Sequence, residues 1–134
     1  MARPHLQSGE ITSLQPLDGE LAQAGSHALL KSAQLEVLRI VLPAGKTLPR
    51  HAVPGEITVQ CLEGSAEFIT DASRQQMQAR DFLHLDGGVA HTITALQDCC
   101  LLVTICLLPA GGSPGSPSSL RTARSGRGPG SAPR

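Results

Sequence analysis

Histidine supplies the most versatile candidate chemistry in this chain of 134 residues. Two of the five histidines, His51 and His91, each follow a glycine-containing turn, in PAGKTLPRHAV and DGGVAHTITA. Imidazole binds Zn, Fe, Ni and Cu, and a site that also offers a carboxylate accepts Mn. It can also hydrogen-bond a polar small molecule. Because two ligands alone hold a divalent ion poorly, the pair predicts either the polar anchors of a binding pocket or part of a metal site.

Other catalytic arrangements find little support. No serine stands in a G-x-S-x-G elbow, and no glycine-rich phosphate loop precedes a helix. Cys61 with His51 or His91 is a possible nucleophile–base pair, but burial would raise the pKa of that thiol. The strands expected to face inward offer no pair of carboxylates for glycoside chemistry.

The elements that must position the histidines are short β-type runs separated by turn residues. In 56–63, Ile57, Val59 and Cys61 alternate with polar residues, which is the pattern of a strand with one buried face. Many short strands punctuated by Gly and Pro indicate an all-β sandwich or closed barrel. The runs are 34–42, 56–63, 66–70, 75–79, 81–86, 91–96 and 100–108, with 10–17 and 27–32 as weaker candidates.

The C-terminal segment 109–134 has a different composition. Gly, Ser and Pro supply 17 of its 26 residues, and Leu120 is its only sizeable apolar side chain. It carries four Arg and no acid, whereas residues 1–108 carry seven Lys or Arg against eleven Asp or Glu. Such a segment cannot offset the entropy of ordering its backbone, so we expect a disordered tail.

Composition excludes several partners and compartments. Aromatic residues are 1% of the chain, which argues against base stacking and so against nucleic-acid binding. No apolar run is long enough to span a membrane, and the N-terminus lacks the apolar region of a signal peptide. Cys61, Cys99, Cys100 and Cys106 include no C-x-x-C pair. They fit a reducing compartment, and we expect a cytoplasmic protein.

Two segments resemble the paired motifs of the cupin superfamily, which are small jelly-roll barrels. The first family motif is G-x5-H-x-H-x3-E-x6-G, and Gly45, His51 and Gly64 match it. The second is G-x5-P-x-G-x2-H-x3-N, and Gly88 and His91 match it. The resemblance covers about residues 34–108 and implies a cupin-like jelly-roll barrel, also called a double-stranded β-helix.

The resemblance is weaker at the metal site. The family binds a metal with three His and one Glu, and here Val53 and Ile57 stand at the second His and the Glu positions. A third ligand to a divalent metal on His51 and His91 could come from Glu56, Cys61 or His84. Glu56 is one residue from the family position, which in a strand means the opposite face unless a bulge at Pro54-Gly55 resets the register.

Arg80, Asp86 and Ala95 replace the Gly, Pro and Asn of the second motif. The resemblance also implies a homodimer, in which a partner chain covers an exposed first strand. We expect residues 1–33 to form an N-terminal arm or outer strands, 34–108 the barrel, and 109–134 the tail.

Three functions remain open at this point. The leading hypothesis is a small molecule bound in the barrel mouth beside an incomplete metal site, and the expected lining is His51, Val53, Ile57, Val59, Cys61, Phe68, His91 and Ile93. The second is a metal-dependent cupin enzyme of the dioxygenase or isomerase type. The third is a non-catalytic structural or regulatory module.

Overall fold

The computed structural model describes residues 5–17, 21 and 24–107. Nine β-strands account for the regular structure in these residues, which contain no α-helix. The strands are β1 (His27–Lys31), β2 (Leu35–Leu42), β3 (Thr47–His51), β4 (Ile57–Glu63), β5 (Ser65–Thr70), β6 (Arg74–Gln78), β7 (Phe82–Leu85), β8 (His91–Ala95) and β9 (Cys99–Cys106). The all-β prediction is confirmed.

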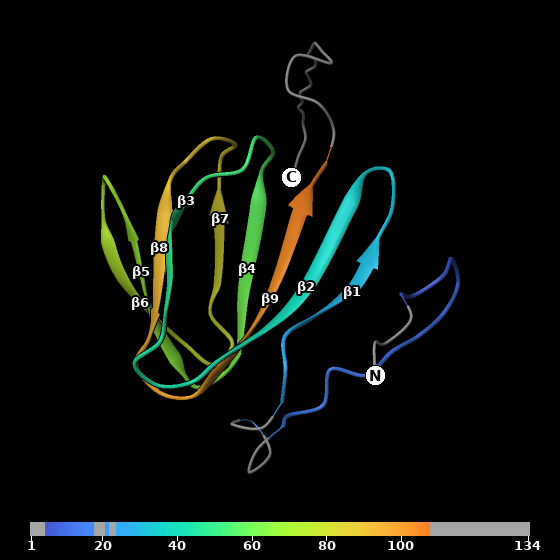
Figure 1. Cartoon of the computed structure of the whole chain (residues 1–134), viewed down its shortest axis with the longest axis horizontal. Helices are drawn as coiled ribbons and strands as arrows, with labels where there is room; N and C mark the ends of the chain where they lie inside the picture. The colour runs from blue at the N-terminus through green and yellow to red at the C-terminus, as the bar shows by residue number, and fades with distance from the viewer. Residues whose placement is uncertain (1–4, 18–20, 22–23, 108–134) are drawn as a thin grey trace, which may run out of the picture.

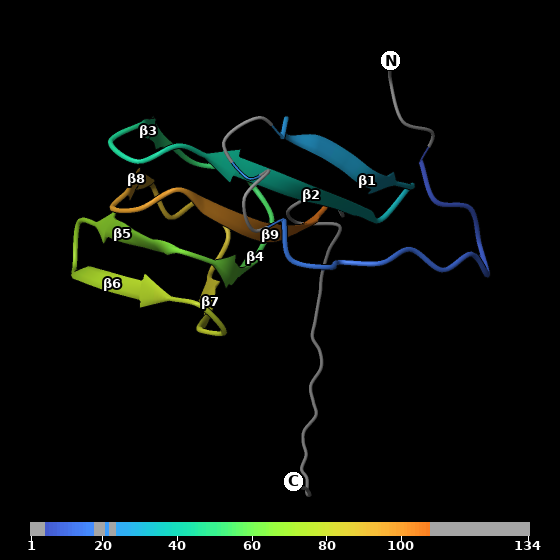
Figure 2. The same ribbon diagram turned by 90° about the horizontal axis from the view of Figure 1, so that it is seen from below.

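The strands form two antiparallel sheets. One sheet has five strands in the order β1-β2-β9-β4-β7, and the other has four in the order β3-β8-β5-β6 (Figure 1). Strands that are distant in sequence are neighbours in both sheets, as β2 and β9 are over their full length. Turned by 90°, the two sheets are seen to lie across from one another (Figure 2). This is the predicted jelly-roll barrel.

The core fills the space between the sheets. Alternate residues of β4, β5, β8 and β9 point into it, and Val59, Cys61, Phe68 and Leu101 are almost completely buried. The period-2 pattern of β4 predicts this directly, because Ile57, Val59 and Cys61 are buried while the residues between them are partly exposed. The site described below lies at one end of this core.

Glycine shapes the turns around the barrel. Gly45, Gly64 and Gly88, the three glycines of the resemblance, all have positive φ angles of 84°, 76° and 81°. At Gly64 a Cβ atom would lie only 2.1 Å from the carbonyl oxygen of Asp98. Only glycine combines this backbone conformation with such a close approach, which explains why the motif needs it there.

Two expectations about the elements differ from the structure. Strand β3 was not predicted, because Pro49 interrupts its sequence. Proline is tolerated there because β3 lies at the edge of its sheet. The weak candidate strand 10–17 is not a strand: its described residues run without regular pairing. The expected tail 109–134 lies outside the described residues.

Two general features of the molecule concern its cysteines and its relation to membranes. All four cysteines, Cys61, Cys99, Cys100 and Cys106, are free thiols. Among the described residues, no helix has the length and apolar character needed to cross a bilayer.

Candidate functional site

A small cavity opens between the two sheets at the barrel mouth. Its volume is about 180 Å³. Six of the residues expected there line it, and they are His51, Val53, Ile57, Val59, His91 and Ile93. Leu38, Ile40, Leu48, Val103 and Ile105 complete the wall. The two histidines are therefore the only polar side chains among the described residues that line this cavity.

His51 and His91 lie side by side on neighbouring strands. They are register partners across β3 and β8, and their ring centroids are 4.4 Å apart with an interplanar angle of 55°. His91 is buried, with 3% of its surface exposed, whereas His51 is exposed at the rim. The pair therefore extends from the solvent-exposed rim of the cavity to its apolar interior.

Each ring is oriented by a hydrogen bond to the backbone carbonyl two residues before it in the chain. Nδ1 of His51 lies 3.1 Å from the carbonyl oxygen of Pro49, and Nδ1 of His91 lies 3.0 Å from that of Val89. A carbonyl oxygen only accepts hydrogen bonds, so each Nδ1 carries the proton and donates. In the neutral rings, each Nε2 is then an acceptor. Within the described part of the chain, neither Nε2 has a hydrogen-bond partner.

His91 is held in place by Phe68. The two rings are stacked, with centroids 5.3 Å apart and an interplanar angle of 11°. Burial lowers the pKa of His91, the hydrogen bond to Val89 raises it, and the neighbouring His51 lowers it further, so that the net shift is downward. Near neutral pH the buried ring is therefore uncharged, and its Nε2 is a free acceptor.

Two residues expected in the lining lie elsewhere. Cys61 and Phe68 point inward but are packed within the core rather than along the cavity. The Cys61 thiol donates toward the carbonyl oxygens of Glu63 and Gly64, and burial raises its pKa. It stays protonated, which makes it a poor nucleophile and a poor metal ligand.

The cavity also includes residues that sequence reasoning missed. Leu38 and Ile40 of β2, and Val103 and Ile105 of β9, each alternate with residues that face away. The same period-2 rule that identified the inner face of β4 applies to both strands. Apolar residues on the opposite face, such as Val37 and Val41 in β2 and Leu102 in β9, hid that alternation.

The residues around His51 and His91 do not fit a tightly held metal ion. A catalytic metal site normally has three protein ligands, and the other two family positions hold Val53 and Ile57. Glu56 and His84 point away from the cavity. His84 is the register partner of Thr58 on the outer face of β4, and Glu56 is exposed, one residue before the inward-facing Ile57. No His, Cys, Asp or Glu among the described residues joins the two histidines in a three-ligand cluster.

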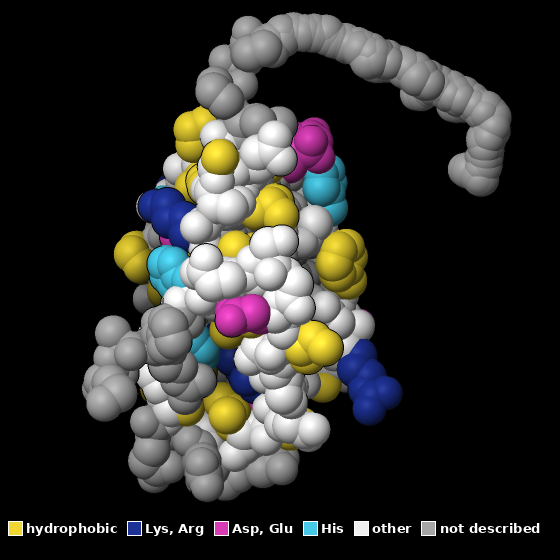
Figure 3. Space-filling model, turned by 90° about the vertical axis from the view of Figure 1, so that its right-hand side faces the viewer, with side chains coloured by type: hydrophobic (Ala, Val, Ile, Leu, Met, Phe, Trp, Pro, Cys, Tyr) yellow, Lys and Arg dark blue, Asp and Glu magenta, His cyan; other side chains and the backbone are white. Residues whose placement is uncertain are grey.

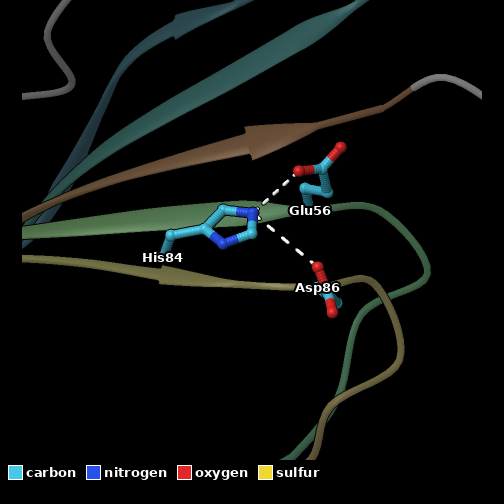
Figure 4. Close-up of side chains that lie close together, drawn as sticks. All are labelled: Glu56, His84 and Asp86. Carbon is cyan, nitrogen blue, oxygen red and sulfur yellow. Dashed lines mark hydrogen bonds and ion pairs between the residues drawn. The ribbon is translucent and has the colours of Figure 1, made fainter. Parts of the chain in front are cut away.

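Glu56 and His84 instead meet Asp86 on the outer face of the five-stranded sheet (Figure 4). His84 Nε2 lies 2.7 Å from Glu56 Oε1 and 4.0 Å from Asp86 Oδ1. All three ligand atoms lie within 4.8 Å of one another. One imidazole and two carboxylates are compatible with a divalent metal ion. Without a metal ion, the same residues form an exposed hydrogen bond between His84 and Glu56 beside the carboxylate of Asp86.

The side of the molecule that bears β1 has no single apolar patch. In Figure 3 the hydrophobic side chains of this face are scattered among polar ones. An open groove of about 530 Å³ lies between β1 and the N-terminal segment, and its lining includes His5, Glu10 and His27. The groove is open, and its lining mixes polar side chains with apolar ones such as Leu6, Ile11 and Leu29. It therefore lacks the enclosed apolar surface that is typical of a specific small-molecule site.

Comparison with known proteins identifies the fold. No protein-family model matches the chain, and no curated protein matches it in sequence. Solved structures do match. A conserved Streptococcus pyogenes protein of unknown function is 20% identical with a TM-score of 0.64, over 81% of this chain and 99% of that one. A cupin superfamily protein from Desulfitobacterium hafniense DCB-2 is 16% identical with a TM-score of 0.62, over 72% and 94%.

An enzyme is also among the similar structures. The DMSP lyase DddQ from Ruegeria pomeroyi DSS-3 is 20% identical with a TM-score of 0.55, over 61% of this chain and 45% of that one. At these identities the comparisons establish the fold. The chain has the cupin fold, and the resemblance read from its glycine and histidine motifs is confirmed at that level.

Proposed function

We propose that this cupin-fold protein binds a small molecule in the barrel mouth, with His51 and His91 as its polar anchors. One observation carries the proposal. His91 Nε2 is a polar atom on a buried side chain with no partner among the described residues. A buried acceptor without a partner is costly, by about 1–3 kcal/mol. A bound molecule that satisfies this atom would remove that cost.

The surrounding wall supports the same proposal. Nine of the lining side chains are apolar, and they enclose a preformed cavity between rigid strands. Small-molecule sites are commonly concave and apolar, with a few polar groups that orient the ligand. The free thiols agree with the reducing cytoplasm as the site of action. The low aromatic content offers no platform for nucleic acid.

The test is a ligand screen by thermal shift on the full chain, with His51→Ala and Leu96→Ala compared. Leu96 is an exposed side chain outside the cavity. We expect ligands that stabilise the wild type and the Leu96→Ala control to stabilise His51→Ala less. Equal stabilisation of all three would contradict the proposal and would favour a structural or regulatory module.

A metal-binding function has one observation in its favour, which is the outer cluster of Glu56, His84 and Asp86. Ligand atoms about 2.0–2.2 Å from a tetrahedral zinc ion lie roughly 3.3 Å from one another. The spacings from His84 Nε2, which are 2.7 Å to Glu56 Oε1 and 4.0 Å to Asp86 Oδ1, lie on either side of that value. The similarity to a lyase adds the enzyme hypothesis, but the cavity lacks the third ligand that such chemistry would need.

Elemental analysis of the untagged protein separates the two locations of a metal. We expect His84→Ala to lower the metal content and His51→Ala to leave it unchanged, because the outer cluster is the one three-ligand group in the part of the chain that the structure describes. Loss of near-stoichiometric metal in His51→Ala would instead support a metal centre in the barrel. Wild-type metal content far below one ion per chain would exclude both.

A further inference from the structure

We infer that the ligand of the barrel mouth is a small apolar molecule, about the size of a substituted benzene ring, that donates a hydrogen bond through a hydroxyl or N–H group. This inference rests on the proposed function and names the chemical class that the cavity selects. It follows from three properties of the cavity, which are the polarity of its two nitrogens, the apolar character of its wall and its volume.

The first property is that the cavity offers acceptors rather than donors. Both Nδ1 atoms donate to backbone carbonyls, His51 to Pro49 and His91 to Val89. Only the two Nε2 atoms remain for a ligand, and that of the buried His91 is an acceptor, because burial keeps this ring uncharged near neutral pH. Alcohols, phenols and amides can donate to them. A carboxylate has only acceptor oxygens, so it would place its charge against the acceptor of His91.

The second property is that the wall provides no compensating charge. Apart from the two histidines, the lining is made of Leu, Ile and Val side chains. The ion pair of Arg50 with Asp71 is an exposed one, and Arg50 does not line the cavity. An anion entering the cavity would lose its hydration and find no cation among the described lining residues. The wall therefore selects a neutral, largely apolar body.

The third property is size. The cavity measures about 180 Å³, and an apolar cavity of roughly 150 Å³ accommodates benzene. A single ring with one small substituent therefore fills the space. The exposed position of His51 and the burial of His91 place the two acceptors at different depths, so one donor can reach His91 while the rest of the ring packs against the strands.

The closing experiment compares phenol, toluene and benzoate by calorimetry on the full chain in the presence of EDTA. Phenol and toluene have nearly the same shape and differ in one hydroxyl group. We expect phenol to bind roughly two- to tenfold more tightly than toluene, as one net hydrogen bond predicts. Benzoate should not bind measurably.

His91→Phe is the matched variant, because the new ring can keep its stacking on Phe68 while it removes the acceptor. We expect it to abolish the preference for phenol and to keep toluene binding. If His91→Phe does not fold, His51→Leu is the second variant, since His51 is exposed at the rim. It should reduce the preference for phenol without removing toluene binding.

The outcomes separate the inference from the proposed function. Equal binding of phenol and toluene, or tighter binding of benzoate, would overturn the donor inference and leave a small-molecule pocket. Phenol binding that appears only when Zn²⁺ replaces EDTA would also overturn it. If none of the three probes binds, the inference fails, and the thermal-shift screen then decides separately whether the cavity takes any ligand.

Discussion

His91 combines three constraints in one side chain. It is buried, its Nδ1 hydrogen is donated to Val89, and its ring is stacked on Phe68. Together these fix both the tautomer and the orientation of the ring, so its free nitrogen has a defined direction. The exposed His51 lacks the stacking partner, and we therefore assign it the weaker part in orienting a ligand.

Acid should destabilise the protein through His91. Burial and the neighbouring His51 lower its pKa in the folded chain below the ordinary value of 6.5. As the pH falls below about 6.5, the unfolded chain takes up a proton that the folded chain does not. The contribution of His91 to stability is therefore complete above pH 6.5 and is lost as the pH falls toward the lowered pKa.

The measurement is urea unfolding at a series of pH values from 8 to 5, for the wild type and His91→Phe. The free energy of unfolding of the wild type should fall more steeply below pH 6.5 than that of the variant. The other four histidines are present in both proteins, and His51 is the one among them that loses a contacting ring in the variant. Parallel curves would mean that His91 is protonated equally well in the folded chain.

At the scale of elements, the turn between β6 and β7 has the left-handed backbone conformation that favours glycine, but the residue there is not glycine. Arg80 has a φ of 80° and is the only residue other than glycine with positive φ among those described. It stands where the second motif of the cupin superfamily has its first Gly. Its backbone N–H donates to the carbonyl of Cys61 at 2.7 Å, and this hydrogen bond holds the turn against the strain.

Arg80→Gly should therefore stabilise the fold. The left-handed conformation costs an L-residue about 1–2 kcal/mol, and the extra freedom of glycine in the unfolded chain offsets part of the gain. We expect the free energy of unfolding to rise by about 0.5–1 kcal/mol. Arg74→Gly, at an exposed position in β6, is the control and should lower it. Destabilisation by both changes would show that the Arg80 side chain matters more than its backbone.

The elements also show what the sequence could predict. Period-2 alternation and turn residues were enough to find eight of the nine strands, because both signals are local. Strand β3 could not be found in this way. Its Pro49 removes a hydrogen-bond donor, and only its edge position and irregular pairing with β8 make the proline acceptable. Both the edge position and the irregular pairing belong to the tertiary structure, which the local sequence does not show.

The candidate site also has a part that local sequence predicts and a part that depends on tertiary structure. The alternation in β4 and the positions of His51 and His91 predicted six residues of the cavity wall. Sequence could not tell that Cys61 and Phe68 lie beyond the cavity, because depth within a barrel depends on how the sheets diverge. It also could not tell which ring nitrogen is free, since that depends on the carbonyls of Pro49 and Val89.

At the scale of the whole molecule, the N-terminal segment covers part of the five-stranded sheet. The buried Arg39 donates to the carbonyl oxygen of Gln15 and to the sulfur of Cys100, and Leu17 N–H donates to Glu63. Leu6 N–H donates to the carbonyl of Leu29 in β1. The first strand, which we expected a partner chain to cover, is thus partly covered by the chain itself.

The opposite end of that sheet is the edge that a second copy would cover. Within the described residues, strand β7 is paired with β4 alone, and an unpaired edge can add a strand from another chain. Phe82 is in β7 and is 65% exposed. It faces outward, because its register partner is Gln60 rather than one of the buried residues of β4.

We therefore propose a homodimer that contacts through β7, and Phe82→Ser should shift it to monomer. Loss of the buried aromatic surface in two symmetric copies weakens association by removing the apolar centre of the contact. Light scattering after size-exclusion chromatography over a range of concentrations measures the mass of each species. Leu96→Ser, which also removes an exposed apolar side chain, is the matched control and should remain dimeric.

A wild-type mass equal to one chain of 14.0 kDa at every concentration would contradict the dimer. A dimer that both variants keep would move the contact away from β7, and β3 or β6, at the edges of the other sheet, would then be the next candidates.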